Sequence, residues 1–274
     1  MNTKKNTAFS KNYSADSLLA TISDIRRARG WRLYTADGGR ILSLWSDYGR
    51  NLLGYTPRGL AERAKSAFDR GLSAPLPGPW NDRIARMTRR LYPEYPFVRL
   101  QGSVKRSNGV ERARFLFDRY LQDRESEQAA EFTRAPQADP IHIILPIPAA
   151  LSPGILAFTT EPLDGIENEL VDGMRGACAI FALSLLALER TSGRLSARFE
   201  ESWRRFDRCG IELFSRSGPW LTPKYPRAAH RDIFAFCATR GVVISPEYDF
   251  PSSVPGDFDD GELRCLQTAA SIFL

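Results

Sequence analysis

The longest apolar stretch of the sequence, Ala177 to Leu188, constrains the fold more than any other feature. It lies in a predicted helix that begins near Ile166, is apolar on almost every side and ends at Thr191-Ser192-Gly193. A bilayer-spanning helix needs about 20 apolar residues, so this run is too short to cross a membrane. A helix that is apolar all round must be covered all round. We therefore expect a buried helix, placed either at the centre of the chain or in a dimer interface.

Length and composition indicate a globular protein. The chain has 274 residues, of which 43% are hydrophobic, enough to bury a substantial core in one large or two small domains. Four widely spaced cysteines without a Cys-x-x-Cys pair, and only two histidines, predict neither a metal site nor a disulfide framework. Residues 1–14 are polar and lack the apolar core of a secretory signal, so we expect a disordered tail and a cytoplasmic protein.

Both ends of the chain alternate strand and helix patterns. Residues 30–46 predict a β-hairpin, because Asp37-Gly38-Gly39 can supply the positive φ angles of a primed turn between alternating apolar and polar flanks. Residues 58–70 repeat apolar side chains at helical spacing and stop at Gly71. Near the other end, a helix over residues 227–240 precedes a predicted strand and a final helix.

The middle of the chain has a different pattern, in which short apolar segments predict strands. A short strand over Phe97 to Leu100 is followed much later by two apolar segments, Ile141 to Pro148 and Gly154 to Phe158. They predict strands joined by a loop, with their prolines at strand ends or on an edge.

The two ends resemble class-III aminotransferases, which are fold-type I pyridoxal-phosphate (PLP) enzymes of the glutamate-1-semialdehyde aminomutase kind. The hairpin of residues 30–46 is similar to the strands that open the small domain of that family. Residues 47–57 are similar to its glycine-punctuated crossing to a helix, with Tyr55 where a histidine is usual. Residues 241–249 and 260–263 resemble the last strand, the substrate-side loop and the final helix.

The resemblance covers about half of the chain and implies a reduced form that lacks most of the large, cofactor-binding domain. We expect an α+β fold in which residues 15–96 and 194–274 pack together as a small-domain-like unit. Residues 97–193 would then be a remnant or a replacement of the large domain, consisting of strands and the buried helix. The resemblance also implies a homodimer, or a complementary aminotransferase-like subunit.

The cofactor lysine is the main departure from the family. In such enzymes a lysine holds PLP as a Schiff base, an aspartate keeps the pyridine nitrogen protonated, and a glycine-rich turn binds the phosphate. None of the six lysines has the family's setting of small residues and glycines, and no aspartate occupies an obvious pyridine-nitrogen position. The lysines are Lys4, Lys5, Lys11, Lys65, Lys105 and Lys224.

A remnant of the phosphate turn is the candidate cofactor site. Ser107, Asn108 and Gly109 stand between the strand ending at Leu100 and a predicted helix over residues 112–121, the order expected of an anion site at a helix N-terminus. They resemble the family's Asn-Ser-Gly-Thr-Glu turn, and Lys105 adds a positive charge. The alternative is a capped helix start without a ligand.

Aromatic residues near the C-terminal segment suggest a ligand pocket. By the same resemblance, Trp220, Tyr225 and Tyr248 lie on the substrate side of the small domain and would line it. The alternative is that these rings pack between a sheet and its helices, as large aromatic side chains often do.

Basic residues are concentrated between Arg83 and Arg119, where nine arginines and one lysine stand against three acidic residues. Such a segment attracts anions. The sequence carries no nucleic-acid motif, however, so we do not expect nucleic acid as a partner. A basic anion- or nucleic-acid-binding module is the weakest of three functional hypotheses.

The leading functional hypothesis is a non-catalytic aminotransferase-related protein that binds a partner or a small ligand, without PLP. The alternative is a PLP-dependent transaminase- or aminomutase-like protein. It would use an unrecognised lysine such as Lys105 or Lys224, or a second chain that completes the site.

Overall fold

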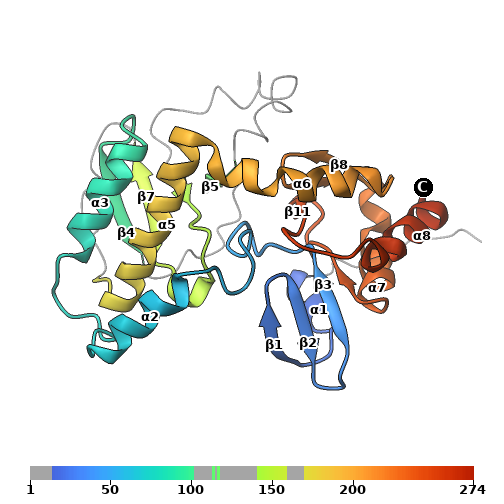
Figure 1. The fold of residues 1–274 in the computed structure, drawn as a ribbon, viewed down its shortest axis with the longest axis horizontal. Helices are drawn as coiled ribbons and strands as arrows, with labels where there is room; N and C mark the ends of the chain where they lie inside the picture. Colours follow the sequence, from blue (N-terminus) through green and yellow to red (C-terminus); the bar gives the residue numbers. More distant parts are fainter. Residues whose placement is uncertain (1–13, 102–112, 115, 118–140, 159–169) are drawn as a thin grey trace, which may run out of the picture.

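A computed structural model describes residues 14–101, 113–114, 116–117, 141–158 and 170–274. These residues mix helices with strands, consistent with the predicted α+β class. Figure 1 shows two groups of elements, one built from the two ends of the chain and one from its middle. None of the helices described here is both long and apolar enough to cross a membrane.

Both ends of the chain contribute to one four-stranded sheet, in the order β1-β2-β3-β10. The predicted hairpin is present as β2 and β3, and Thr35 N–H donates to Gly39 O across its turn. Strand β10 then pairs in parallel with β3, with Val242 opposite Leu42. The strands are β1 (Ile25–Arg29), β2 (Arg32–Thr35), β3 (Arg40–Ser43) and β10 (Val242–Val243).

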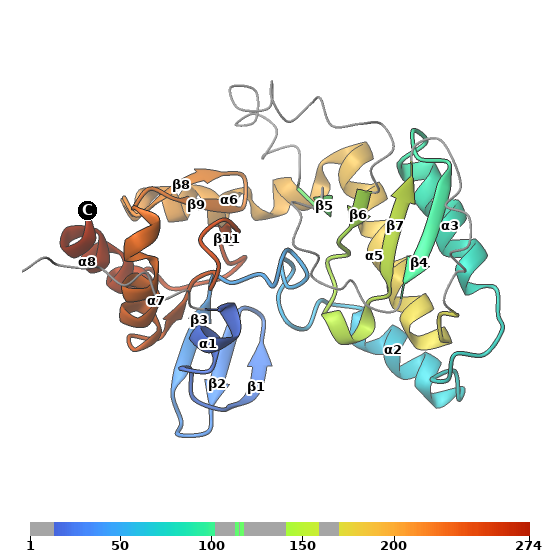
Figure 2. The ribbon, with the colours of Figure 1, turned by 180° about the vertical axis from the view of Figure 1, so that it is seen from behind.

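A three-stranded sheet, in the order β11-β9-β8, lies beside that sheet together with several helices (Figure 2). The predicted helix over residues 227–240 divides into a short 3-10 turn and α7. The elements are α1 (Ala15–Leu19), β8 (Phe214–Ser217), β9 (Trp220–Pro223), the 3-10 helix η2 (Arg227–Ala229), α7 (His230–Ala238), β11 (Ser252–Ser253), the 3-10 helix η3 (Asp260–Leu263) and α8 (Arg264–Phe273).

The middle of the chain forms a second four-stranded sheet, in the order β4-β7-β6-β5. Helices α2 and α3 both pack against the long helix α5. The elements are α2 (Leu60–Asp69), α3 (Trp80–Leu91), β4 (Phe97–Gln101), β5 (Ala113–Arg114), β6 (Ile141–Ile143), the 3-10 helix η1 (Ala149–Leu151), β7 (Gly154–Phe158) and α5 (Gly173–Ser192).

Two sequence expectations in this region are wrong. The helix predicted over residues 112–121 is not helical at Ala113 and Arg114, which pair in parallel with β6. The long helix begins at Gly173, later than predicted, because the carboxylate of Asp172 accepts the N–H of Arg175 at 2.8 Å and caps its first turn.

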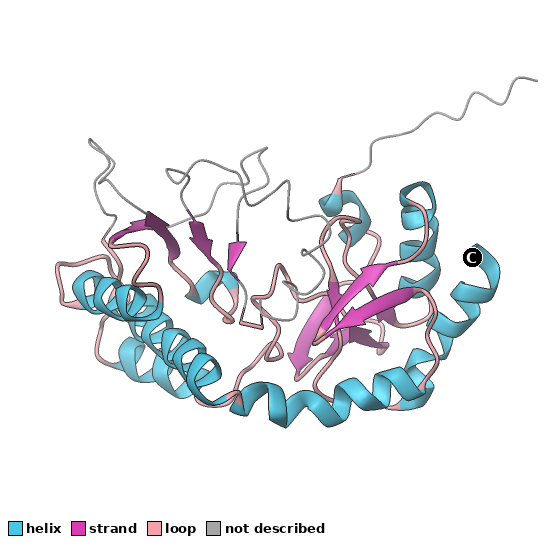
Figure 3. Ribbon diagram, turned by 90° about the horizontal axis from the view of Figure 1, so that it is seen from above, coloured by secondary structure: helices cyan, strands magenta, loops and turns pink. Residues whose placement is uncertain are grey.

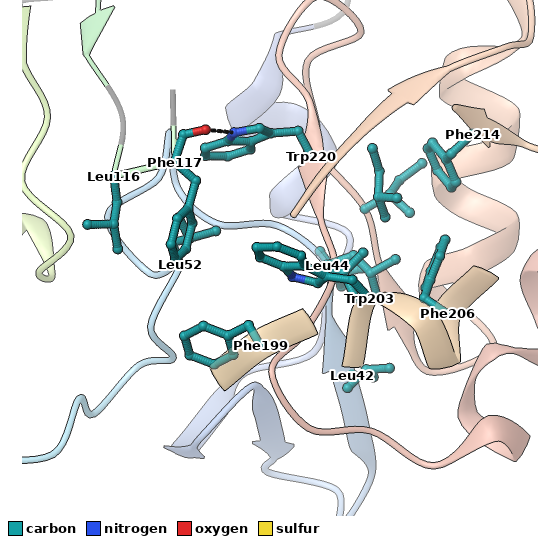
Figure 4. Close-up of a cluster of buried hydrophobic side chains, with 14 of the residues drawn as sticks. Leu42, Leu44, Leu52, Leu116, Phe117, Phe199, Trp203, Phe206, Phe214 and Trp220 are labelled. Atoms are coloured by element: carbon teal, nitrogen blue, oxygen red, sulfur yellow. Dashed lines mark hydrogen bonds between the residues drawn. The ribbon is translucent and has the colours of Figure 1, made fainter. Parts of the chain in front are cut away.

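Helices α5 and α6 (Arg194–Arg208) connect the two groups of elements, and Figure 3 shows the sheets lying on one side of these two helices. Gly193 separates the two helices in the left-handed conformation, with φ of 59°. Large side chains fill the space between the groups (Figure 4). The ring of Phe117 meets those of Phe199 and Trp203 on α6 edge to face, with centroids 6.3 and 5.7 Å apart.

Candidate functional site

An ion-pair cluster joins the two ends of the chain next to the first sheet. The guanidinium of Arg32 donates to both carboxylate oxygens of Glu262, at 3.0 and 2.9 Å, and to Asp257 at 2.9 Å. Arg40 also pairs with Glu262, at 3.3 Å. The side chains of Arg32 and Glu262 are only 15% and 11% exposed, so this cluster holds residues 257–262 firmly against β2.

The loop that follows β3 takes an unusual backbone path. Asp47 and Tyr48 have φ of 48° and 57°, in the left-handed region, and Gly49 follows with φ of 90°. The hydroxyl of Tyr48 donates to the carboxylate of Glu247, and its ring packs edge to face on Phe250 at 4.5 Å. The two segments that resemble the aminotransferase family therefore meet at this loop.

A cluster of aromatic side chains lies beside the loop. The hydroxyl of Tyr225 is 3.1 Å from Nδ1 of His230, and the hydroxyl of Tyr248 donates to the carbonyl of Tyr225 at 2.8 Å. Burial lowers the pKa of His230, although hydrogen bonds with the backbone near Ser245 and Pro246 oppose the shift. The imidazole is therefore mostly neutral at pH 7 and acts as a packed polar group.

The three aromatic residues predicted to line a pocket are not all together. Tyr225 and Tyr248 are in contact, with ring centroids 6.0 Å apart. Trp220 is fully buried and donates its indole N–H to the carbonyl of Phe117 at 3.3 Å, in the core shown in Figure 4. Tyr225 is buried as well, whereas Tyr248 is half-buried beneath the guanidinium of Arg227 at 4.8 Å. A pocket at these rings stays a prediction.

The predicted phosphate turn, comprising Lys105, Ser107, Asn108 and Gly109, lies outside the described residues. Its role stays a prediction too. The strand at Ala113–Arg114 nevertheless removes the helix start that the sequence reading placed directly after this turn.

The two lysines within the described part of the chain lie on the surface. Lys65 is on α2, where its side chain is 79% exposed and pairs with Asp69 at 3.3 Å. Lys224 follows β9 and is exposed. A cofactor-binding lysine is activated by desolvation or by a neighbouring cation. Neither Lys65 nor Lys224 is desolvated.

The two buried carboxylates of the described chain serve helix ends. Asp172 caps α5, and Glu189 accepts the N–H groups of Leu195 and Ser196, both at 3.1 Å, in the first turn of α6. Neither carboxylate is joined by a buried lysine. PLP needs a lysine, a carboxylate for its pyridine nitrogen and a phosphate cradle, and among the residues that the structure describes no lysine lies beside a buried carboxylate.

A basic pocket lies between the end of α6 and the beginning of α8, and we call it the α6–α8 pocket. Its volume is about 290 Å³, and its lining residues include Arg205, Arg208, Cys209, Asp260, Arg264 and Gln267. Sequence reasoning missed this pocket. The helical spacing of Arg205 and Arg208 was a signal, but their proximity to Arg264 depends on the packing of distant segments.

Comparisons with known proteins agree with the fold. No protein-family model matches the sequence. An uncharacterised protein of Borreliella burgdorferi is 24% identical over 249 residues, which cover 90% of this chain and 89% of that protein. A glutamate-1-semialdehyde 2,1-aminomutase from Heliobacterium modesticaldum is 30% identical over 79 residues, but these cover only 29% of this chain and 18% of the aminomutase.

Solved structures extend the likeness over most of the chain. The crystal structure of N-acetylornithine aminotransferase from Stenotrophomonas maltophilia superposes with a TM-score of 0.60 and 13% identity, covering 92% of this chain and 96% of that one. A transaminase with PLP bound gives a TM-score of 0.59 and 10% identity, covering 92% and 91%. Identities this low establish the fold and not the activity. The chain therefore has an aminotransferase-like fold.

Proposed function

We propose that this protein is a non-catalytic relative of the PLP-dependent aminotransferases, which binds a small ligand or a partner. The aminotransferase-like fold supports the ancestry. One observation carries the loss of catalysis: Lys65 and Lys224, the lysines of the described chain, are both exposed and outside any enclosed site. Without a Schiff-base lysine, transamination loses its covalent step and its proton carrier together.

The connection between β6 and β7 supports the same proposal. Residues 144–153 contain three prolines and no ionisable side chain, and Leu145 and Ile147 are buried in the core. This connection contributes packing and no side chain that titrates as an acid or a base. On this proposal, residues 97–193 are a reduced remnant or replacement of a large cofactor domain.

A second candidate function is favoured by the likeness to a transaminase with PLP bound. In that case the protein would be a PLP-dependent transferase that uses Lys105 or Lys224, or a subunit whose site a second chain completes. A homodimer is the corresponding arrangement for a self-contained protein. The two candidate functions differ in whether a covalent bond forms between PLP and a lysine.

Borohydride reduction tests the proposal. The purified protein is incubated with PLP at a one-to-one ratio, reduced, and analysed by intact mass and peptide mapping. We expect no single stoichiometric pyridoxyl adduct, only trace labelling spread over exposed lysines such as Lys65. The matched variants Lys105→Arg and Lys224→Arg should label like the wild type.

A stable adduct at one lysine, abolished by one of these two variants, would reject the non-catalytic function and identify the Schiff-base residue. If an adduct forms only after a copurifying protein is added, the proposal of a non-catalytic protein would be replaced by that of a subunit whose site a second chain completes.

A further inference from the structure

The α6–α8 pocket is lined by three arginines, and the proposed function gives it no role so far. Its volume of about 290 Å³ is just below the usual range for small-molecule pockets, so it suits a small ligand group. Arg205 and Arg208 are one turn apart on α6, and Arg264 and Gln267 are one turn apart on α8. The two pairs line the same pocket from different helices.

Hydrogen bonds fix the two walls relative to each other. The Nε group of Arg205 donates to Asp260 at 2.6 Å, and the amide of Gln267 donates to the carbonyl of Cys209 at 2.6 Å. The guanidinium of Arg205 also lies over the ring of Phe258, at 5.0 Å from its centroid. Its orientation is therefore set before any ligand arrives, which lowers the entropic cost of binding.

The pocket has an excess of positive charge. Three arginines face a single carboxylate, that of Asp260, within its lining. Arg208 is held from outside the pocket by Glu201, at 2.9 Å. Among the described residues, no acidic side chain lies within ion-pair distance of Arg264, which is exposed. Burial raises the pKa of the Cys209 thiol, so this group stays neutral and adds no negative charge.

Guanidinium groups present planar pairs of N–H donors that match the oxygens of phosphate and carboxylate. Three arginines against the carboxylates of Asp260 and Glu201 leave about one positive unit, which suits a phosphate monoester, an anion that carries between one and two negative charges near pH 7. We propose that the α6–α8 pocket binds the phosphate group of a small phosphomonoester. This inference rests on the proposed function, because it names the ligand class of the binding role.

Phosphate titration of the full chain tests the inference. Inorganic phosphate and glycerol phosphate are titrated by calorimetry, with succinate as a dicarboxylate probe and chloride at matched ionic strength as a blank. Arg264→Gln removes a positive charge that no described carboxylate neutralises. We expect it to weaken phosphate binding about tenfold, the size of one charge-assisted hydrogen bond.

Arg204→Gln is the matched control. Arg204 is an exposed arginine on α6 that pairs with Glu200 and Glu201 and is not among the residues lining the pocket. Its loss should change phosphate affinity less than twofold. Equal weakening by the two variants would show only general charge attraction and would overturn the inference.

Three other outcomes would also overturn the inference that the pocket binds phosphate. Tighter binding of succinate than of phosphate would replace the phosphate ligand by a dicarboxylate. Oligonucleotide binding that is tighter than phosphate binding and falls steeply with salt would indicate nucleic acid instead. No binding by the wild type would reject this pocket as the site while leaving the non-catalytic function standing. That function fails separately, through a stoichiometric PLP adduct.

Discussion

Gly256 lies where aromatic rings from two parts of the chain meet. A Cβ atom at this position would lie 2.3 Å from Cη2 of Trp31 and 2.5 Å from Cε1 of Phe199. The rings of Trp31 and Phe199 pack edge to face against each other, with their centroids 6.0 Å apart, so neither ring can move without disturbing the other. We predict that Gly256→Ala lowers the free energy of unfolding by about 1–3 kcal/mol, the usual cost of overpacking.

Gly261→Ala is the control for that prediction. A Cβ at Gly261 would meet no atom within 4 Å, so its effect should stay within about 0.5 kcal/mol. Urea unfolding followed by tryptophan fluorescence measures both variants. Similar losses for the two would mean that the contact with Trp31 and Phe199 is not what makes position 256 sensitive.

Single functional residues were harder to predict than the packing around them. The resemblance puts Tyr225 and Tyr248, from two separate segments, on the substrate side of the small domain, and their rings are in contact with centroids 6.0 Å apart. It grouped Trp220 with them, yet this ring points to the carbonyl of Phe117. Arg205 and Arg264 are 59 residues apart in the chain and meet only through the packing of α6 and α8.

At the scale of elements, the junction of α5 and α6 depends on Glu189. Glu189 is only 3% exposed, and one of its carboxylate oxygens accepts the N–H groups of Leu195 and Ser196. Both N–H groups belong to the first turn of α6, where the backbone N–H groups of a helix need acceptors from outside its own ladder of hydrogen bonds. We predict that Glu189→Ala destabilises the protein by about 2 kcal/mol, since it leaves buried donors without an acceptor.

The matched variant is Glu200→Ala, on the exposed side of the same helix. Glu200 makes only a long contact with Arg204, at 3.9 Å, and its removal should cost less than about 0.5 kcal/mol. Thermal unfolding of the two variants at equal concentration compares them. If Glu189→Ala were as stable as Glu200→Ala, the carboxylate would not be needed to begin α6.

Element prediction succeeded where local signals are strong. The hairpin of β2 and β3 and the helix α2 follow from a glycine turn and from apolar periodicity. Strand β5 was missed because its two residues are held by pairing with β6, a contact that no local pattern encodes. The start of α5 was misplaced because an aspartate cap, Asp172, decides it more than the apolar periodicity does.

At the scale of the whole molecule, Arg32 connects the two ends of the chain. Its hydrogen bonds to Glu262 join residues 230 positions apart and fix η3 onto β2. We predict that Arg32→Gln destabilises the protein by about 2 kcal/mol, between the values for exposed and buried pairs. Arg29→Gln, which removes an exposed arginine opposite Arg32 on β1, should be nearly neutral.

The pH dependence of the stability difference between the wild type and Arg32→Gln identifies the origin of that difference. Burial raises the pKa of Glu262, but hydrogen bonds from Arg32 and from the N–H of Asp259 outweigh it and hold the pKa below the ordinary value of 4.5. A carboxylate with a lowered folded-state pKa stabilises the protein above its unfolded-state pKa, and this stabilisation disappears as the pH falls through the folded-state pKa. Urea midpoints of the wild type and of Arg32→Gln should therefore differ most at pH 6–7 and converge as the pH falls below 4.5 and through the folded-state pKa of Glu262, while Arg29→Gln follows the wild type throughout. A difference that stays constant down to pH 3 would show that Arg32 stabilises the two ends through packing and not through ionised Glu262.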